Sequence, residues 1–168
     1  MNSHQKKFSQ LYDQYIDKIY RFVFLKVNSQ EVAEDLTSET FLRGWRTFKE
    51  QEEKIGNPPA FLYQIARNLV IDFYREKGKT QLVSTEFAQI DDPDNNPEEK
   101  ALLRSDIDAV KQCLGNLKED YQNMVIWHYL DDLSIPEIAK IMQKPEGTVR
   151  VTLHRALKAL KNELNQIA

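Results

Sequence analysis

The sequence SIPEIAKIMQKPEGTVRVTLHRALKALK, residues 134–161, contains the pattern that decides the fold. Ser134 and Glu137 have the spacing of a capping box and predict the start of a short helix. Residues 143–145 predict a turn, and apolar residues three or four apart predict a longer, basic helix over about residues 146–164. A short capped helix, a brief turn and a longer basic helix are typical of a helix-turn-helix unit that reads DNA.

The second helix of this unit carries side chains suited to a major groove of DNA. These are Thr148, Arg150, Val151, His154 and Arg155. Arg150 and His154 are four residues apart, so they share a face, and an arginine can pair with guanine through two hydrogen bonds. The same spacing also fits a helical hairpin whose basic face is only solvated, so the pattern leaves both interpretations open.

Five further helices are predicted before this unit, the last two over about residues 103–114 and 118–130, and no segment shows the alternation of a β-strand. The first ends near Val27, and the second begins with Asn28 as its N-cap and Glu31 three residues later. Residues 56–59, Gly-Asn-Pro-Pro, separate it from a third helix over about residues 60–77. The sequence therefore predicts an all-α protein.

The charge pattern separates two small helical domains. Residues 84–106 contain 2 basic and 7 acidic side chains, and DDPDNNP at residues 91–97 has the composition of a loop. We therefore expect a helical domain over residues 1–80, a flexible acidic linker over residues 81–100 and a helix-turn-helix domain over residues 101–168.

Composition and motifs favour a binding protein over an enzyme. The 168 residues have a net charge of −3 and a single cysteine, Cys113, which excludes an internal disulfide and a zinc site built from cysteines. There is no glycine-rich phosphate loop, no Gly-x-Ser-x-Gly and no His-Glu-x-x-His motif. No signal peptide and no apolar run of the roughly 20 residues that span a membrane is found. We expect no catalytic residue, metal or cofactor, no membrane insertion and a cytoplasmic location.

The second helix carries a polar strip in which acidic and basic side chains recur four residues apart. Its members are Asp35, Thr37, Ser38, Glu39, Arg43 and Arg46. Such a strip either forms intrahelical ion pairs on a solvated face, each worth roughly 0.2–0.5 kcal/mol, or docks against a partner. Solvated ion pairs are the commoner outcome of this spacing.

The third helix mixes aromatic side chains with arginine and asparagine, among them Tyr63, Arg67, Asn68, Tyr74 and Arg75. Such a mixture suits single-stranded nucleic acid, because bases stack on rings at roughly 1–3 kcal/mol each while cations contact phosphates. The alternative, which the pattern alone favours, is that Tyr63 and Tyr74 are rings at the edge of the core with solvated hydroxyl groups.

Taken together, these stretches resemble an RNA polymerase sigma factor of the extracytoplasmic-function (ECF) group over nearly the whole chain. In the first half, the resemblance rests on AEDLTSETFLRGWRTF (residues 33–48), FLYQIARN (61–68) and DFYR (72–75). In the second half, it rests on LKEDY (117–121), LSIPEIA (133–139) and PEGTVR (145–150). The family usually continues this last motif with Ser-Arg, where this chain has Val151 and Thr152.

The resemblance implies a protein that brings core RNA polymerase to promoters. The strip of Asp35, Thr37, Ser38, Glu39, Arg43 and Arg46 would dock on the clamp helices of the β′ subunit. The first domain would melt the minus-ten element and capture an unstacked base with Asn68. The residues implied at that element are Phe48, Asn57, Tyr63, Arg67, Asn68 and Arg75. The second domain would read the minus-thirty-five element with Thr148, Arg150, Val151, His154 and Arg155.

The implied partners are core RNA polymerase, through the β′ clamp helices and the β flap, together with promoter DNA and an anti-sigma factor. Two other interpretations compete with a sigma factor. A free-standing helix-turn-helix regulator would bind a palindromic operator as a dimer, but it leaves residues 1–83 without a role. A helical adaptor would bind only protein, with the basic last helix as its docking face. Co-elution with core polymerase distinguishes the sigma factor from both.

Overall fold

The computed structural model describes residues 2–80, 109 and 111–167, so the predicted linker over residues 81–100 lies outside the described residues. The described part of the chain divides into two compact units. The elements are α1 (Ser3–Val27), α2 (Gln30–Gln51), the short 3-10 helix η1 (Glu52–Lys54), α3 (Pro58–Thr80), α5 (Glu119–Val125), the π turn η2 (Ile126–Leu130), α6 (Ile135–Met142) and α7 (Glu146–Ile167). The predicted all-α fold class is confirmed.

The junction between α1 and α2 differs from the prediction by one residue. Asn28 ends α1 in a left-handed conformation (φ 58°), and its N–H group donates to the carbonyl oxygen of Phe24. Ser29 is the N-cap of α2, and its side chain accepts a hydrogen bond from the N–H group of Val32. Asparagine tolerates the left-handed conformation well, which explains why it takes the C-cap here and leaves the N-cap to serine.

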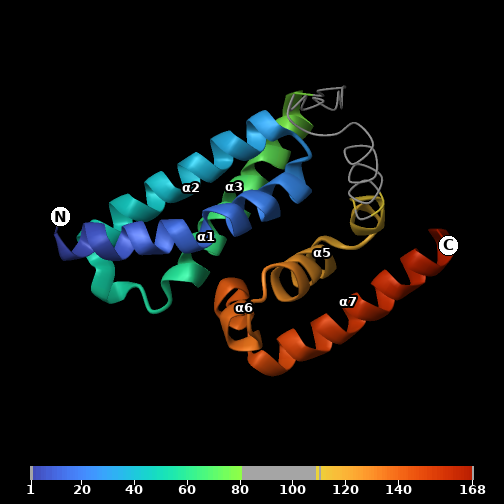
Figure 1. The fold of residues 1–168 in the computed structure, drawn as a ribbon. Helices are drawn as coiled ribbons and strands as arrows, with labels where there is room; N and C mark the ends of the chain where they lie inside the picture. The colour runs from blue at the N-terminus through green and yellow to red at the C-terminus, as the bar shows by residue number, and fades with distance from the viewer. Residues whose placement is uncertain (1, 81–108, 110, 168) are drawn as a thin grey trace, which may run out of the picture. The chain divides into compact units, whose positions relative to one another are not determined.

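The core of the first unit lies between α1, α2 and α3. Figure 1 shows α1 and α2 side by side, with α3 packed against both. Apolar spacing favours Val32, Leu36 and Trp45 on the inner face of α2, but these side chains are only partly buried. The residues of α2 that are buried are Ala33, Thr37, Thr40, Phe41, Gly44 and Phe48. The inner face of α2 is therefore built largely from small side chains, which allow the neighbouring helices to come close.

Gly44 allows the closest approach between α2 and α3. A Cβ atom at this position would lie 2.6 Å from Cδ2 of Leu62 and 3.6 Å from the ring of Phe8. Leu62 is fully buried, so moving this terminal methyl group aside would disturb the packing around it. Glycine is required here by a close contact, and not by an unusual backbone conformation.

In the second unit, α5 packs against α7. Met124 and Trp127 are fully buried, as is Ala156 of α7. The sequence predicts one regular helix over about residues 118–130, but its last turn widens into a π turn, in which the N–H group of Asp131 donates to the carbonyl oxygen of Ile126 at 2.9 Å. The same turn buries Asp131 completely, although the sequence favours a solvated or capping acid at this position.

The helix-turn-helix follows directly. Ser134 and Glu137 form the predicted capping box: each residue's N–H group donates to the other's side-chain oxygen at 3.2 Å. Gln143 adopts a left-handed conformation (φ 55°) in the turn between α6 and α7. The predicted order of short helix, turn and long helix is confirmed.

The apolar face of α7 is less completely covered than its leucine spacing predicts. Val149, Leu153 and Ala156 are buried, whereas Leu157 is 38% exposed and Leu164 is 52% exposed. Among the described residues, no helix combines the length and the apolar composition that crossing a bilayer requires.

Replacing Gly44 by alanine should lower the free energy of unfolding by about 1–3 kcal/mol, because the added methyl group overlaps Leu62. The matched control is Gly78→Ala, since a Cβ atom at this other glycine in the first unit meets nothing within 4 Å. Alanine should stabilise the control by up to about 1 kcal/mol. Urea denaturation followed by circular dichroism measures both changes. Equal stability of the two variants would contradict the packing role of Gly44.

Candidate nucleic-acid interface

The side of α2 that faces away from the core, which we call the outer face of α2, carries most of the predicted polar strip. Asp35, Ser38, Arg43 and Arg46 are exposed, and Glu39 is partly exposed. Thr37 is the exception: it lies on the inner face and is 3% exposed. The prediction that Thr37 belongs to an exposed strip is therefore corrected, because its position on the helix turns it toward the core.

Leu42 lies within this outer face, although the polar pattern does not include it. Its side chain is 45% exposed, and it is seven residues after Asp35 and four before Arg46, so the three share one side of the helix. Apolar side chains surrounded by charged ones are typical of protein interfaces. The signal in the sequence is an apolar residue out of phase with the buried Phe41 and Phe48.

The charges of the outer face are only partly neutralised within the helix. Nε of Arg43 lies 2.8 Å from Oε1 of Glu39, and both side chains are substantially exposed. This is the intrahelical pair that a solvated strip predicts, and such pairs contribute roughly 0.2–0.5 kcal/mol. Within the part of the chain that the structure describes, Asp35 and Arg46 form no ion pair. The outer face therefore keeps one acidic and one basic group available to a partner.

Asn68 and Arg75 lie together on the outer face of α3. They are seven residues apart, which is about two helical turns, and both side chains are exposed. Nη1 of Arg75 is 3.9 Å from Oδ1 of Asp72, and the Arg75 side chain is 73% exposed. A pair so long and so exposed holds the guanidinium group weakly, so Arg75 can exchange Asp72 for a phosphate.

Phe48 and Tyr63 are core residues. They are 4% and 0% exposed, respectively. The ring centroid of Phe48 lies 5.6 Å from that of Phe8, and the ring centroid of Tyr63 lies 6.0 Å from that of Phe22. The prediction that these two rings touch DNA is therefore corrected: they position α2 and α3, and they reach no external surface.

Asn57 and Arg67 are only partly exposed. Oδ1 of Asn57 accepts a hydrogen bond from the N–H group of Ala60 at 2.9 Å, so Asn57 caps the start of α3. Arg67 is partly exposed, and its Nε atom is buried with no hydrogen-bond partner among the described residues. Asn57 thus acts as a helix cap. Arg67 lies at the edge of the outer face of α3.

A charged cluster holds the start of the segment between α2 and α3. Oε1 of Glu52 accepts a hydrogen bond from Nζ of Lys7 at 2.9 Å, and Oε2 lies 2.5 Å from Nδ1 of His4. The hydrogen bond from Lys7 holds the pKa of the Glu52 carboxyl group below its usual value. The N-terminal turns of α1 therefore fix the beginning of the segment that the resemblance associates with minus-ten recognition.

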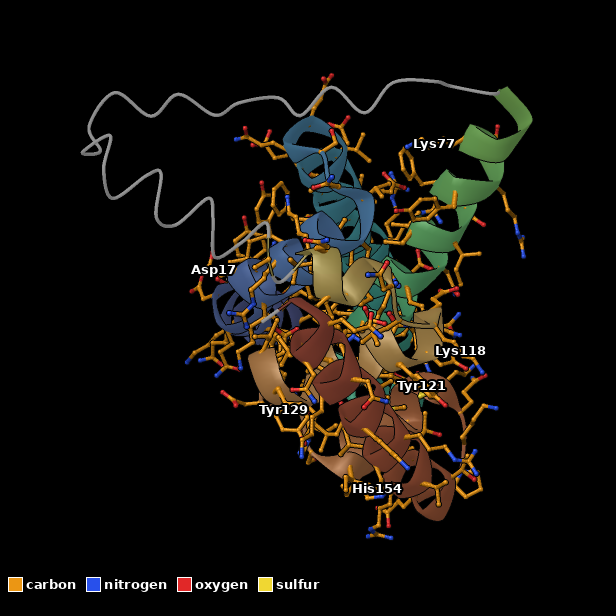
Figure 2. The ribbon with its side chains drawn as sticks, turned by 90° about the vertical axis from the view of Figure 1, so that its right-hand side faces the viewer. Asp17, Lys77, Lys118, Tyr121, Tyr129 and His154 are labelled. Atoms are coloured by element: carbon orange, nitrogen blue, oxygen red, sulfur yellow. The ribbon has the colours of Figure 1, made fainter. Side chains whose placement is uncertain are left out.

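All five predicted residues of α7 are exposed, namely Thr148, Arg150, Val151, His154 and Arg155. Figure 2 labels His154 among the outward side chains of this helix. Nη2 of Arg150 lies 3.9 Å from Oε2 of Glu146, and both side chains are well exposed. Such a weak pair leaves the arginine available to a base or a phosphate.

Lys158 extends the same face and is missing from the sequence prediction. It is exposed and follows His154 by four residues, so it lies one turn further along the helix. The i+4 spacing from His154 is the signal that would have included it. The exposed face of α7 therefore carries four cationic residues: Arg150, Arg155, Lys158 and Lys161.

Two families match the chain, one in each half. The family described as Sigma-70 region 2 matches residues 11–80. The family described as Sigma-70, region 4, matches residues 107–160. The first match contains most of α1, all of α2 and all of α3, and the second contains α5, α6 and most of α7.

Relatives match along most of the chain. The ECF RNA polymerase sigma factor BldN of Streptomyces coelicolor is 35% identical over 157 residues, which is 91% of this chain and 58% of that protein. The ECF RNA polymerase sigma factor SigW of Bacillus subtilis is 28% identical over 174 residues, which is 97% of this chain and 91% of that protein. The chain therefore spans a little over half of BldN and nearly all of SigW.

Two solved structures share the fold. The sigma factor RpoE in a co-crystal with the anti-sigma factor NepR from Bartonella quintana has a TM-score of 0.73 and 21% identity, and the match covers 95% of this chain and 98% of RpoE. CnrH in complex with the cytosolic domain of CnrY has a TM-score of 0.72 and 18% identity, and the match covers 98% of this chain and 91% of CnrH.

The helices α1 to α3 and a helix-turn-helix with a basic exposed face define an all-α DNA-binding protein. The two family matches and the relatives specify the class further. The chain belongs to the ECF group of RNA polymerase sigma factors.

Proposed function

We propose that this chain directs core RNA polymerase to specific promoters and starts transcription there, acting by binding alone and in the cytoplasm. The observation that supports the proposal is that three helices each expose a polar face. The outer faces of α2 and α3 and the exposed face of α7 are polar, while the opposite face of each helix is buried in a core. The side chains of each face suit a different binding partner.

The outer face of α2 suits the clamp helices of the β′ subunit. Leu42 supplies an apolar contact, and the exposed charges of Asp35 and Arg46 surround it. Ser38, Glu39 and Arg43 extend this face. Charges at the rim of such a contact select the partner and the register more than they add affinity. Thr37 acts from the core, where it helps to set the orientation of α2.

The outer face of α3 suits the melted minus-ten strand. The amide of Asn68 offers both a donor and an acceptor to the edge of a flipped base, and Arg75 lies two turns away on the same side to contact the phosphate backbone. Arg67 stands at the edge of this surface. Phe48, Asn57 and Tyr63 contribute indirectly, because they fix the ends and the depth of the helices that form it.

The exposed face of α7 suits the major groove at the minus-thirty-five element. Its N-terminal half bears Thr148, Arg150, Val151, His154 and Arg155, and the helix N-terminus itself favours a phosphate. Lys158 lies one turn later and suits the backbone. A contact between the second domain and the β flap of the polymerase, and an anti-sigma partner that covers these faces, belong to the same proposal.

The test of this function is gel filtration with core polymerase, followed by run-off transcription from promoters mapped after overexpression. Co-elution together with new, specific transcript starts is the expected result. Specific DNA binding without polymerase, combined with dimerisation, would favour a free-standing helix-turn-helix regulator. Binding to neither polymerase nor DNA would favour an adaptor and would overturn the proposal.

Reversing two charges on α2, Asp35→Arg with Glu39→Arg, should abolish binding to core polymerase and keep the fold. Close charge pairs across an interface couple by about 1.5–7 kcal/mol, so reversing two of them should reduce affinity at least tenfold. The matched control is Asp13→Arg with Asp17→Arg, two exposed acids with the same spacing on α1. Fluorescence anisotropy with labelled core enzyme measures both. Equal affinity of the two double variants would show that the strip is only solvated.

Replacing Arg150 by alanine should lower activity mainly on promoters with an intact minus-thirty-five element. The loss of an arginine–base pair should cost on the order of 1–3 kcal/mol and relax specificity at one position. Run-off transcription from a set of single-base variants of the element measures this. A uniform loss on every sequence would instead assign Arg150 to a phosphate.

Replacing Asn68 by alanine should leave helix content and polymerase affinity near wild type but impair opening of the promoter. The side chain is exposed, so its removal opens no cavity. A template with a pre-melted minus-ten bubble should restore opening but not base preference, because it removes the unstacking cost without restoring the hydrogen bonds.

Permanganate footprinting measures opening for this variant, and Glu76→Ala provides a control at another exposed position of α3. The control should open the promoter normally. Normal opening and unchanged base preference in Asn68→Ala would assign Asn68 a structural role only.

A further inference from the structure

We propose that Val151 is a specificity-determining residue that recognises the 5-methyl group of one thymine in the minus-thirty-five element. This inference rests on the proposed function, because it concerns which chemical group the exposed face of α7 reads. Val151 supplies an apolar contact at the centre of a face whose other members are polar or charged.

The exposure of Val151 is the first observation. Its side chain is 49% exposed, although Val149 and Leu153, two residues away on either side, are buried in the core. Val151 therefore stands outside the apolar stripe of α7. A β-branched side chain here stabilises neither the core nor the isolated helix, since valine is a poorer helix former than most polar residues.

The surroundings of Val151 are the second observation. His154 and Arg155 follow it by three and four residues, so both lie beside it one turn further along the helix, and both are exposed. Arg150 and Thr148 lie toward the helix N-terminus and are exposed too. The valine methyl groups thus form a single apolar spot between hydrogen-bond donors.

Gly147 provides the third observation. It precedes Val151 by four residues, so the two positions lie on the same side of α7, one turn apart. A Cβ atom at Gly147 would meet nothing within 4 Å, which shows that the space beside this position is open. No side chain of the described residues therefore lies within 4 Å of this position, the neighbour of Val151 toward the helix N-terminus.

The chemistry of the major groove selects the target of this spot. Of the four base pairs, only those with thymine present an apolar group in the major groove, the C5-methyl group. The other groups there are hydrogen-bond donors and acceptors. A valine would displace water from these groups without forming a hydrogen bond to them. Valine at position 151 therefore offers a base an apolar contact on a face whose other members offer polar ones.

The experiment removes only the methyl group. The preferred minus-thirty-five element is first selected from a randomised library with holoenzyme, and each thymine is then replaced by deoxyuracil on either strand. One such replacement should weaken promoter binding by wild-type holoenzyme about fourfold, the size expected for one buried methyl group. The same replacement should change binding by the Val151→Ser holoenzyme by less than a factor of 1.5, because no apolar partner remains.

The matched control is Leu157→Ser, which makes a similar change at another exposed apolar position of α7, on a different side of the helix. It should keep the fourfold methyl effect. A preferred element without thymine, an absence of any methyl effect or a methyl effect that persists in Val151→Ser would each overturn the inference. Holoenzyme that initiates normally in these cases leaves the proposed function standing, whereas a chain that forms no active holoenzyme overturns both.

Discussion

The contact between Gly44 and Leu62 is the constraint on which the first unit depends. The distance of 2.6 Å from a Cβ atom at Gly44 to Cδ2 of Leu62 shows that α2 and α3 approach more closely there than any side chain at Gly44 permits. Because α1 packs against both helices as well, the inner faces of α2 and α3 are buried in one core and their outer faces are left exposed. Asp35, Leu42 and Asn68 lie on those outer faces.

Several aromatic side chains of the first unit are buried in its core, although aromatic side chains also suit contacts with DNA bases. Phe8 lies against Phe41, Trp45 and Phe48, with ring centroids 5.4–6.3 Å apart. Tyr63 is surrounded in the same manner by Tyr15 and Phe22. These rings fill a small core that needs large apolar side chains, since a unit of this size buries little surface per residue. The polar Asn68 and Arg75 are then free to face outward.

The modest net charge of −3 fits a protein whose affinity is divided among several surfaces. Free DNA binding by electrostatics requires many cationic contacts, and the exposed face of α7 provides four cations, Arg150, Arg155, Lys158 and Lys161. Surfaces that are individually weak become strong when they are linked, because binding of the first raises the effective concentration of the next. Under the proposed function, a chain with several weak binding faces therefore binds promoter DNA more tightly in complex with the polymerase than alone.

The sequence by itself determined the elements, their order and the capping box at Ser134 and Glu137, because helical periodicity and capping depend on neighbours within one or two turns. It also placed the exposed residues of α7 correctly. It misplaced Thr37, Phe48 and Tyr63, because periodicity ranks faces by hydrophobicity and cannot tell how deeply each side chain is covered by another helix. That depth is set by contacts between residues far apart in the chain, such as Gly44 with Leu62, and only the tertiary structure decides them.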